Sequence, residues 1–454
     1  MLPEKILENY HRFINPVLDL VESAFLYWFI YISSGDNGFS AALIAASVGA
    51  IVYAVIPNLN TENLSMNVRT FASLINTALL LMIIFYKTTA PAALYGKIFI
   101  IASLLICGFI LFMTHKMAVQ NFVFMMISLS IVKIDPDYPL LLVAIIIVTF
   151  ILSGGFYVKV LKAHIDILMF WKKNLENLCV RQYEDSPVYG GRPEDSQTKF
   201  HLPGIKGFVR HLKVISGFNP FAVFLGVYPF LGEKITLLNP GSSATEIIWW
   251  WGILTYFMVF ATTYIKPLRF LGEGWKYIKF AAFPTAFITA DILLYVLSDS
   301  ATKTTGAFVV FLFVACLAAC VLITLRLQNK FRSERTMGIL DENLMAVFDY
   351  IKSLDGKSLA CIPTHISNAA VFYTGKKVLW GGHSIVSSLE GFFPVIMNPL
   401  EYYIKKYGIS YIVLDTSYIP PDKIKLSSYR LLFNSGRYNI YETGVCSSYH
   451  EKQD

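Results

Sequence analysis

The sequence predicts a polytopic α-helical membrane protein, with about ten transmembrane helices and a small C-terminal soluble α/β domain. Of its 454 residues, 55% are hydrophobic and only 15% are charged, whereas a soluble domain carries about 25% charged residues. Charges are sparse between about Phe13 and Leu327 and become frequent after that point. This uneven distribution predicts a transmembrane domain over 1–328 and a soluble domain over 329–454.

Apolar runs define the expected spans, because a transmembrane helix needs roughly 20 mostly apolar residues. The runs lie at 16–34, 38–57, 68–86, 92–113, 118–133, 138–158, 219–232, 245–265, 277–297 and 306–327. Two of them, 118–133 and 219–232, are short, so either could be re-entrant or extend into its flanks. The expected number of spans therefore holds to within one or two.

A polar insert at 159–218 separates the sixth run from the seventh. Its first part, His164 to Val180, has apolar residues at helical spacing, which is typical of a helix lying in the membrane interface. The following stretch, from Glu184 to Gly204, is rich in Gly, Pro, Asp and Glu. We expect an interfacial helix followed by a surface loop.

The C-terminal part has the pattern of a small α/β layer domain. Helical spacing over Met337–Leu354 is followed by short β-rich runs that alternate with helices. We expect strands at 358–362, 377–380 and 409–415, helices at 368–374 and 400–407, and a closing hairpin from 429–433 and 438–442. No GxGxxG motif follows a strand, so the sequence predicts no dinucleotide site.

The formal net charge of +7 comes from Lys and Arg between the spans. Such residues govern topology and contact with anionic lipid, and they form no separate basic domain, so no nucleic acid is expected as a partner. No CxxC or HExxH spacing predicts a metal site. With ten spans, most cations share one face with both termini, and the positive-inside rule would place that face in the cytoplasm.

The segment from Lys266 to Pro284 has the highest density of candidate binding residues. It carries four cations at the mouth of a span, Lys266, Arg269, Lys276 and Lys279. Long basic side chains can extend along a helix and bind phosphate oxygens. Lys276 and Lys279 are three residues apart, so they would share a helix face. The alternative is an interfacial anchor that only follows membrane electrostatics.

Other polar residues at or within spans are weaker candidates. His115 and Lys116 follow the fourth run directly and could bind phosphate, or could simply be a polar helix end. Arg69 could hold an anionic headgroup or pair with Glu62. Asp291 lies in the middle of a span, where a carboxylate is costly and marks function by default, although a neighbouring polar group could satisfy it.

Several motifs together resemble the GT-C superfamily of polytopic membrane glycosyltransferases. The apolar span ending at Pro57, followed by a loop and Arg69, is similar to the repeated unit of these proteins. Phe112-Met-Thr-His115-Lys116 looks like their Thr-His span end, and Trp275–Pro284 resembles their Arg-Tyr-hydrophobic-Glu-Phe-Ala-Ala-Pro-Pro box, with Lys276 and Lys279 in place of Arg and Glu. The segments 373–380 and 407–415 resemble their terminal domain.

The resemblance implies a polyprenyl-phosphate-linked sugar as donor, with cations stabilising the lipid phosphate. The residues that would take this role are Arg69, His115, Lys116, Arg269 and Lys276. It also implies a possible divalent metal and catalytic carboxylates in a first external loop, and we expect this chain to lack that loop together with the first span. Among the acids near the start, Glu4, Glu8, Asp19 and Glu22, none shows the paired arrangement that the resemblance implies, so the catalytic residue is unknown.

The sequence therefore leaves the function open between two classes. One is a membrane glycosyltransferase-like protein, which is catalytically incomplete if no acidic loop is supplied. The other is a non-catalytic transporter, lipid-handling or envelope-assembly protein. The resemblance implies a cell-membrane protein whose terminal domain is extracytoplasmic, whereas the positive-inside count implies the opposite.

Overall fold

The computed structural model divides the chain into two compact units, which we describe separately. The first consists of Met1–Lys162 and Pro203–Asn329, and the second of Ala163–Leu202 and Lys330–Asp454. The structure describes residues 4–33, 39–56, 68–88, 94–175, 183, 205, 208–209, 219–231, 243–272, 274–297, 303–336, 341–355, 358–379, 391–393 and 395–444.

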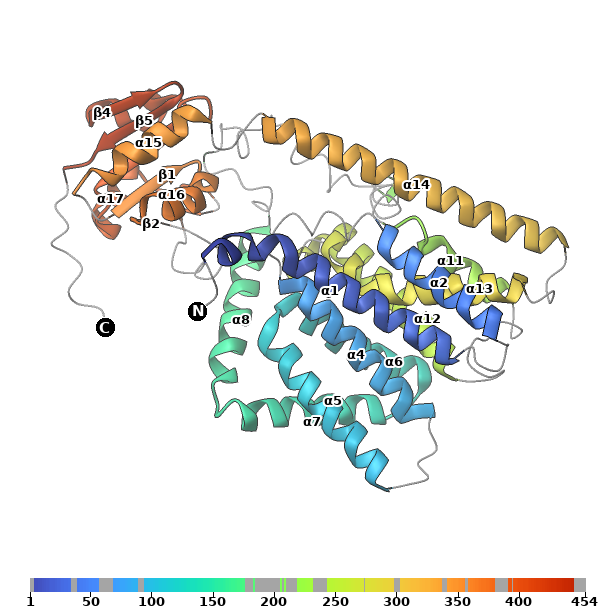
Figure 1. Ribbon diagram of the computed structural model, residues 1–454. Coiled ribbons are helices and arrows are strands. Elements are labelled where there is room, and N and C mark those ends of the chain that lie inside the picture. Colours follow the sequence, from blue (N-terminus) through green and yellow to red (C-terminus); the bar gives the residue numbers. More distant parts are fainter. Residues whose placement is uncertain are drawn as a thin grey trace. The chain divides into compact units, whose positions relative to one another are not determined.

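The first unit is helical throughout its described residues (Figure 1). Its elements are α1 (Glu4–Ser33), α2 (Phe39–Val55), α4 (Val68–Thr88), α5 (Leu94–Thr114), α6 (Lys116–Lys133), α7 (Asp137–Leu152), α8 (Tyr157–Lys173), α11 (Ala222–Val227), η4 (Tyr228–Phe230), α12 (Ser243–Tyr264), η5 (Lys266–Leu271), η6 (Gly274–Ala281), α13 (Ala282–Leu297) and α14 (Lys303–Thr336). Helices α8 and α14 continue into the second unit.

Seven described helical segments are long and apolar enough to cross a membrane, and an eighth is possible if the bent pair α7–α8 counts as one span. The expected polytopic helical fold is confirmed, and we call this part the membrane unit. Helix α2 is apolar but has only 17 residues. The weak run 219–232 contains only the six-residue α11 and the three-residue η4.

The predicted span 138–158 is interrupted in the structure. Helices α7 and α8 meet at an angle of 118° (Figure 1). The turn between them contains Gly154 and Gly155, with φ values of 57° and 81°. Glycine adopts such positive φ angles at little steric cost, which allows the sharp change of direction. The expected interfacial helix thus begins earlier, at Tyr157, and ends at Lys173.

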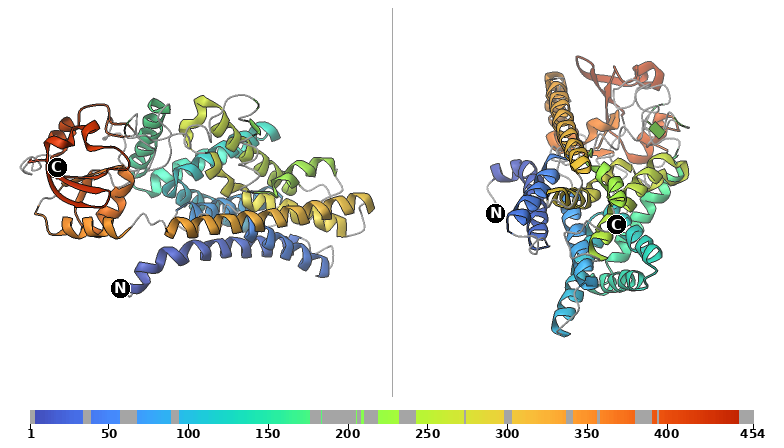
Figure 2. Two further views of the ribbon diagram at one scale, coloured as in Figure 1. Left: turned by 90° about the horizontal axis from the view of Figure 1, so that it is seen from above. Right: turned by 90° about the vertical axis from the view of Figure 1, so that its right-hand side faces the viewer.

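The helices of the membrane unit differ greatly in burial. The apolar window of Gly274–Val296, which contains α13, is 100% buried within the protein, whereas that of α5 is 22% buried. Helix α5, light blue in Figure 2, lies at the edge of the unit. Helix α13 packs against α2, α12 and η6. Side chains on α13 and on the second half of η6, from Tyr277 to Ala281, therefore face protein, and a charge placed there must find its partners within the unit.

The second unit, which we call the terminal unit, contains a five-stranded sheet in the order β2-β1-β3-β5-β4. Strands β2, β1 and β3 are parallel, and β5 and β4 are antiparallel additions. Its elements are α15 (Glu342–Lys352), β1 (Ser358–Ile362), η7 (Thr364–Ile366), α16 (Ser367–Thr374), β2 (Lys377–Leu379), α17 (Leu400–Tyr407), β3 (Tyr411–Asp415), η9 (Pro421–Ile424), η10 (Leu426–Ser428), β4 (Arg430–Ser435) and β5 (Tyr438–Glu442).

Helices cover both faces of this sheet (Figures 1 and 2). Successive residues of a strand point to opposite faces. Leu359 and Cys361 of β1 accordingly belong to a core shared with α15 and α16. Ala360 and Ile362 of β1 belong to the core on the other side, shared with α17. The terminal unit is therefore a three-layer α/β/α structure, in which β1 and β3 are central.

The end of α8 takes part in the terminal unit. Phe170 stacks on Phe393 with 6.2 Å between ring centroids, and Trp171 meets the same ring edge-on at 5.9 Å. Phe170 and Phe393 are both buried. The apolar side of the amphipathic helix therefore packs against protein at this end.

Candidate functional site

Two predicted cations meet at one aromatic ring, and a third interacts electrostatically with one of them. The Cζ atom of Arg69 lies 5.8 Å from the ring centroid of Trp275, and the Nζ atom of Lys276 lies 5.6 Å from it. Lys116 lies close enough to Lys276 for the two cations to repel each other electrostatically. We call Arg69, Lys116, Lys276 and Trp275 the cation cluster. An indole ring attracts cations held over its face, so Trp275 helps to gather like charges.

The cluster is built from the starts of α4 and α6 and from η6, which pack together. Gly274 lets η6 approach α12 closely, because a Cβ at this position would overlap the Thr263 hydroxyl and the Val259 carbonyl oxygen. The Tyr277 hydroxyl lies 2.8 Å from Oε1 of Gln120 and connects η6 to α6. These contacts fix Trp275 and Lys276 between the two helix starts.

The other two predicted phosphate ligands lie on neighbouring residues. His115 is the N-cap of α6, directly before Lys116. Arg269 lies in η5 and donates to the Tyr264 carbonyl at 3.5 Å. The structure therefore brings Arg69, Lys116 and Lys276 together, whereas His115 directly precedes Lys116 and Arg269 lies in the separate element η5. Glu62, the predicted partner of Arg69, falls outside the described residues.

Lys279 points into the protein and is separate from the cation cluster. Residues i and i+3 eclipse in a 3₁₀ helix, with a rise of about 2 Å per residue. Lys279 therefore shares a face with Lys276, as the sequence predicts, but lies about 6 Å farther along η6. It is fully buried and forms an ion pair with Asp19 of α1.

A second charged group surrounds Lys279 inside the membrane unit. Glu22 lies three residues after Asp19 on α1, so both carboxyl groups share one face of the helix. Oε1 of Glu22 accepts hydrogen bonds from Thr77 at 2.6 Å and from Ser73 at 3.2 Å. Glu22 is fully buried and Asp19 is 9% exposed. We call Asp19, Glu22 and Lys279 the buried triad.

The sequence-based predictions did not include this group, although Asp19 and Glu22 were named among the acids near the start. Both lie inside the predicted span 16–34, and the rule that made Asp291 a candidate applies equally to them. Their spacing of three residues within an apolar run was the available signal. Their partner Lys279 lies 260 positions later, and no local pattern connects the two segments.

Asp291 does not join either cluster. It lies in α13, is 1% exposed and interacts electrostatically with Tyr228 of η4. It follows Lys279 by twelve residues, which corresponds to about 18 Å along a helix axis. Asp291 is thus a separate intramembrane carboxyl group, and its function is still a prediction.

The described residues do not fit a divalent metal, which the family resemblance implies as a possibility. Among the described residues, no group of three or more His, Cys, Asp or Glu side chains is arranged to hold a metal ion. The carboxyl groups of Asp19 and Glu22 are engaged by Lys279, Ser73 and Thr77. An ammonium group in this position also repels a second cation. We therefore assign no step to a metal ion.

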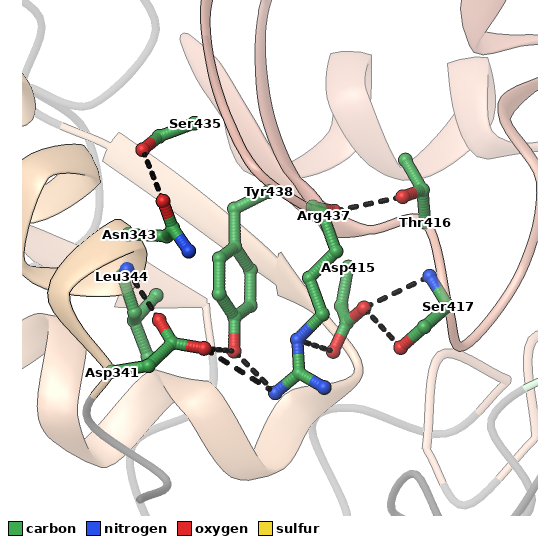
Figure 3. Close-up of polar contacts among 9 residues, drawn as sticks. All are labelled: Asp341, Asn343, Leu344, Asp415, Thr416, Ser417, Ser435, Arg437 and Tyr438. Carbon is green, nitrogen blue, oxygen red and sulfur yellow. Dashed lines mark hydrogen bonds and ion pairs between the residues drawn. The ribbon is translucent and has the colours of Figure 1, made fainter.

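The terminal unit contains a charged group of the same composition (Figure 3). Arg437 lies between two carboxylates, with Nε 3.4 Å from Oδ2 of Asp415 and a terminal nitrogen 3.8 Å from Oδ2 of Asp341. Ser417 donates to Asp415 through its backbone N–H at 2.9 Å and its hydroxyl at 2.6 Å. We call Asp341, Asp415 and Arg437 the surface triad.

The surface triad connects secondary-structure elements. Asp341 is the N-cap of α15 and accepts from the backbone N–H of Leu344 at 2.7 Å. Asp415 ends β3, and Arg437 lies in the turn between β4 and β5. The triad therefore joins α15, β3 and the closing hairpin. Burial lowers the pKa of the neighbouring His365, partly offset by Asp415, and Arg437 lowers it further.

Comparison with known proteins gives a structural match but no sequence match. No protein-family model matches the chain, and no curated protein matches it either. The structure of ArnT from Cupriavidus metallidurans in the apo state is similar, with a TM-score of 0.50, 10% sequence identity, and coverage of 94% of this chain and 82% of that chain. The chain therefore has a fold similar to that of ArnT.

A second ArnT structure, bound to undecaprenyl phosphate, gives a TM-score of 0.49 and 11% identity, and covers 95% of this chain and 84% of that chain. ArnT is a polyprenyl-phosphate-dependent enzyme of the GT-C family. The apo structure, with its TM-score of 0.50, confirms the expected fold. At this level of identity the likeness concerns the fold alone, so the substrate of this chain must be argued from its own residues.

Proposed function

We propose that this GT-C-type membrane protein binds a polyprenyl-phosphate-linked sugar and that the cation cluster holds its phosphate. The observation that supports this is the meeting of Arg69 and Lys276 at Trp275, with Lys116 close enough to Lys276 to interact with it electrostatically. Three like charges from three separate elements repel one another. A phosphate between them would replace this repulsion with charge-assisted hydrogen bonds.

The types of residue suit a phosphate on a lipid. The guanidinium of Arg69 can bind two phosphate oxygens at once, whereas Lys116 and Lys276 act as point charges. Trp275 has an apolar body and a polar N–H, which is typical of the membrane interface. When a sugar leaves a lipid phosphate, negative charge develops on that phosphate, and fixed cations stabilise it. The proposal covers binding and this charge stabilisation, and it assigns no general base.

Lipid-binding variants test the proposal. Replacing Arg69 and Lys276 together by Met removes the two charges on Trp275 and keeps side-chain length. We expect polyprenyl-phosphate binding to fall about tenfold or more for each charge lost, because a hydrogen bond to a charged group contributes about 1.5–3 kcal/mol. Native mass spectrometry of the purified protein would compare polyprenyl phosphate with phosphatidylglycerol.

The matched control is Lys97→Met, which removes an exposed cation of α5. This variant should bind both lipids as the unmodified protein does. Equal retention of both lipids by the unmodified protein and the double variant would mean that the cluster is an interfacial anchor. A protein that binds the lipid-linked sugar selectively but transfers no sugar in a product assay would be a lipid-handling protein.

We also propose that the terminal unit is extracytoplasmic, on the side where the family resemblance places it. The positive-inside rule would place a face with so many cations in the cytoplasm. Lipid-phosphate binding offers another reason for the cations on that face. A variant that keeps Cys446 as its sole cysteine would be labelled in sealed vesicles of known orientation. Labelling of right-side-out vesicles by an impermeant reagent is expected. Labelling only after permeabilisation would place the unit in the cytoplasm.

A further inference from the structure

The buried triad has an unbalanced charge count. With all three side chains ionised, Asp19, Glu22 and Lys279 would carry a net charge of −1. The group lies within two predicted spans, and Glu22 and Lys279 are fully buried. Keeping an uncompensated charge in such a place costs several kcal/mol, and buried groups commonly change their protonation state to avoid it.

Among the side chains that the structure describes, the surrounding elements supply no second cation. The groups that act on Glu22 are Lys279 of η6, Asp19 of its own helix, Thr77 of α4 and Tyr53 of α2. Ser73 of α4 is its other hydrogen-bond donor. Thr and Ser do not titrate, and a tyrosine hydroxyl stays neutral near pH 7. Among the described neighbours, Lys279 is therefore the single positive charge for two carboxyl groups.

The ion pair distinguishes the two carboxyl groups. Asp19 receives the ammonium of Lys279 directly, which favours its ionised form. Among the described residues, the hydrogen-bond donors to Glu22 are hydroxyl groups, those of Thr77 and Ser73 on Oε1 and that of Tyr53. Each carboxyl group has one buried oxygen, Oδ2 of Asp19 and Oε2 of Glu22, without a partner in hydrogen-bond geometry among the described residues. Neutral hydroxyl groups compensate a buried charge less than an ammonium does, so Glu22 is the carboxyl group on which a proton removes the excess charge.

We propose that the buried triad is an intramembrane proton-binding site. At neutral pH it holds one proton on Oε2 of Glu22, beside ionised Asp19 and ionised Lys279, with a net charge of zero. Binding adds a proton from water to a carboxylate oxygen, and release returns it to water. The proposal depends only on the triad and does not require that the protein binds a lipid phosphate.

The site has a defined depth in the membrane unit. Ser73 follows Arg69 by four residues on α4, and Lys279 follows Lys276 by three residues on η6. Both spacings place the triad about 6 Å farther along than the cation cluster. Ser73 therefore lies on the same side of α4 as the half-buried Arg69, and the proton site is about one helical turn from a polar surface.

Infrared spectroscopy of the reconstituted full-length protein tests the proposal, because a protonated carboxyl group and a carboxylate absorb at different frequencies. All variants would be made on an Asp291→Asn background, so that the other intramembrane carboxyl group of α13 contributes nothing. At pH 7 the parent should show one protonated carboxyl band. Glu22→Gln should remove it.

Charge balance makes two less obvious predictions. Asp19→Asn leaves Glu22 as the sole partner of Lys279, so Glu22 should ionise and the band should disappear although Glu22 is still present. The double variant Asp19→Asn with Lys279→Met leaves Glu22 without a cation, and the band should return at its original intensity. Thermal melting in detergent would confirm that each variant is folded.

Three results would overturn the proposal. The first is a Glu22→Gln difference spectrum that shows the loss of a carboxylate. The second is an unchanged band in Asp19→Asn, and the third is the absence of the band in the folded double variant. Should one variant fail to fold, the remaining difference spectra still decide between a protonated and an ionised Glu22.

Discussion

The buried triad and the surface triad contain the same charges in different surroundings. Each has two carboxyl groups and one base, Lys279 in the membrane unit and Arg437 in the terminal unit. The side chain of Lys279 is 0% exposed, whereas that of Arg437 is 47% exposed. Asp415 is buried in the surface triad, but its partner Arg437 reaches solvent and Ser417 donates two hydrogen bonds to Asp415, so a net charge of −1 can be stabilised there. In the buried triad Glu22 and Lys279 are both closed off from solvent, which is why we propose a bound proton for the same charge count.

The comparison shows that residue composition alone does not determine protonation. Desolvation decides it, together with the number of donors that reach each oxygen. It also predicts that equivalent substitutions should have very different effects in the two units. Four experiments sharpen or contradict this contrast.

Lys279→Met should have the largest effect. Removing one member of a buried ion pair typically costs about 3–5 kcal/mol, because the remaining charge has lost its partner. Chemical denaturation of the detergent-solubilised protein would measure the change in unfolding free energy. Lys276→Met, on the same 3₁₀ helix but half-exposed, is the control and should cost less than about 0.5 kcal/mol. Similar costs for both variants would contradict the contrast.

Thr77→Val should have the next largest effect. It removes the 2.6 Å hydrogen bond to Glu22 and keeps the side-chain shape. A neutral Glu22 predicts a loss of about 1 kcal/mol in unfolding free energy, whereas an ionised Glu22 predicts about 1.5–3 kcal/mol. Thr149→Val is the matched control, because the Thr149 hydroxyl is buried and, among the described residues, donates to the Ile145 carbonyl of its own helix. A loss of unfolding free energy of about 1.5–3 kcal/mol would indicate that Glu22 is ionised.

Arg437→Met should cost less, about 0.5–1 kcal/mol, because ion pairs that water can reach are weak. The cost should shrink further at high salt, since ions screen exposed charges. Thermal unfolding of the terminal unit at two salt concentrations would measure both effects. Arg430→Met, which removes a 78% exposed side chain on the same hairpin, should be nearly neutral. A salt-independent loss would mean that Arg437 acts through packing.

The smallest expected effect is the pH dependence contributed by His365. Burial lowers its pKa from the ordinary value of 6.5, so the unfolded chain binds a proton more readily than the folded unit. The terminal unit should therefore lose stability as the pH falls below about 6.5, until the folded histidine also protonates. His365→Gln should flatten this slope in pH-dependent melting curves. An unchanged slope would assign the effect to other groups.

Much of the fold could be predicted because its signals are local. The bounds of β1 and α17 agree with the expected ranges, since both have a clear apolar pattern bordered by turn residues. The bend between α7 and α8 was missed because hydropathy does not detect a change of direction. Gly154 and Gly155 were its visible signal.

The candidate site was predictable only in part. Arg69, Lys116 and Lys276 were found because cations at the ends of apolar runs are evident in a sequence. Their meeting at Trp275 depends on the packing of α4, α6 and η6, which no local pattern specifies. The buried triad was missed for the same reason, because its ion pair joins the first helix to a segment near residue 279.

Gly274 has a consequence for interpreting mutations in this protein. A methyl group there would act as a wedge between η6 and α12, because it would overlap oxygen atoms of Thr263 and Val259. The displaced segment carries both Lys276 and Lys279, so the cation cluster and the buried triad would shift together. Loss of lipid binding and loss of the stored proton in Gly274→Ala would therefore share one steric origin. Such a variant would measure the effect of displacing η6. It would not test the role of the cation cluster or of the buried triad separately.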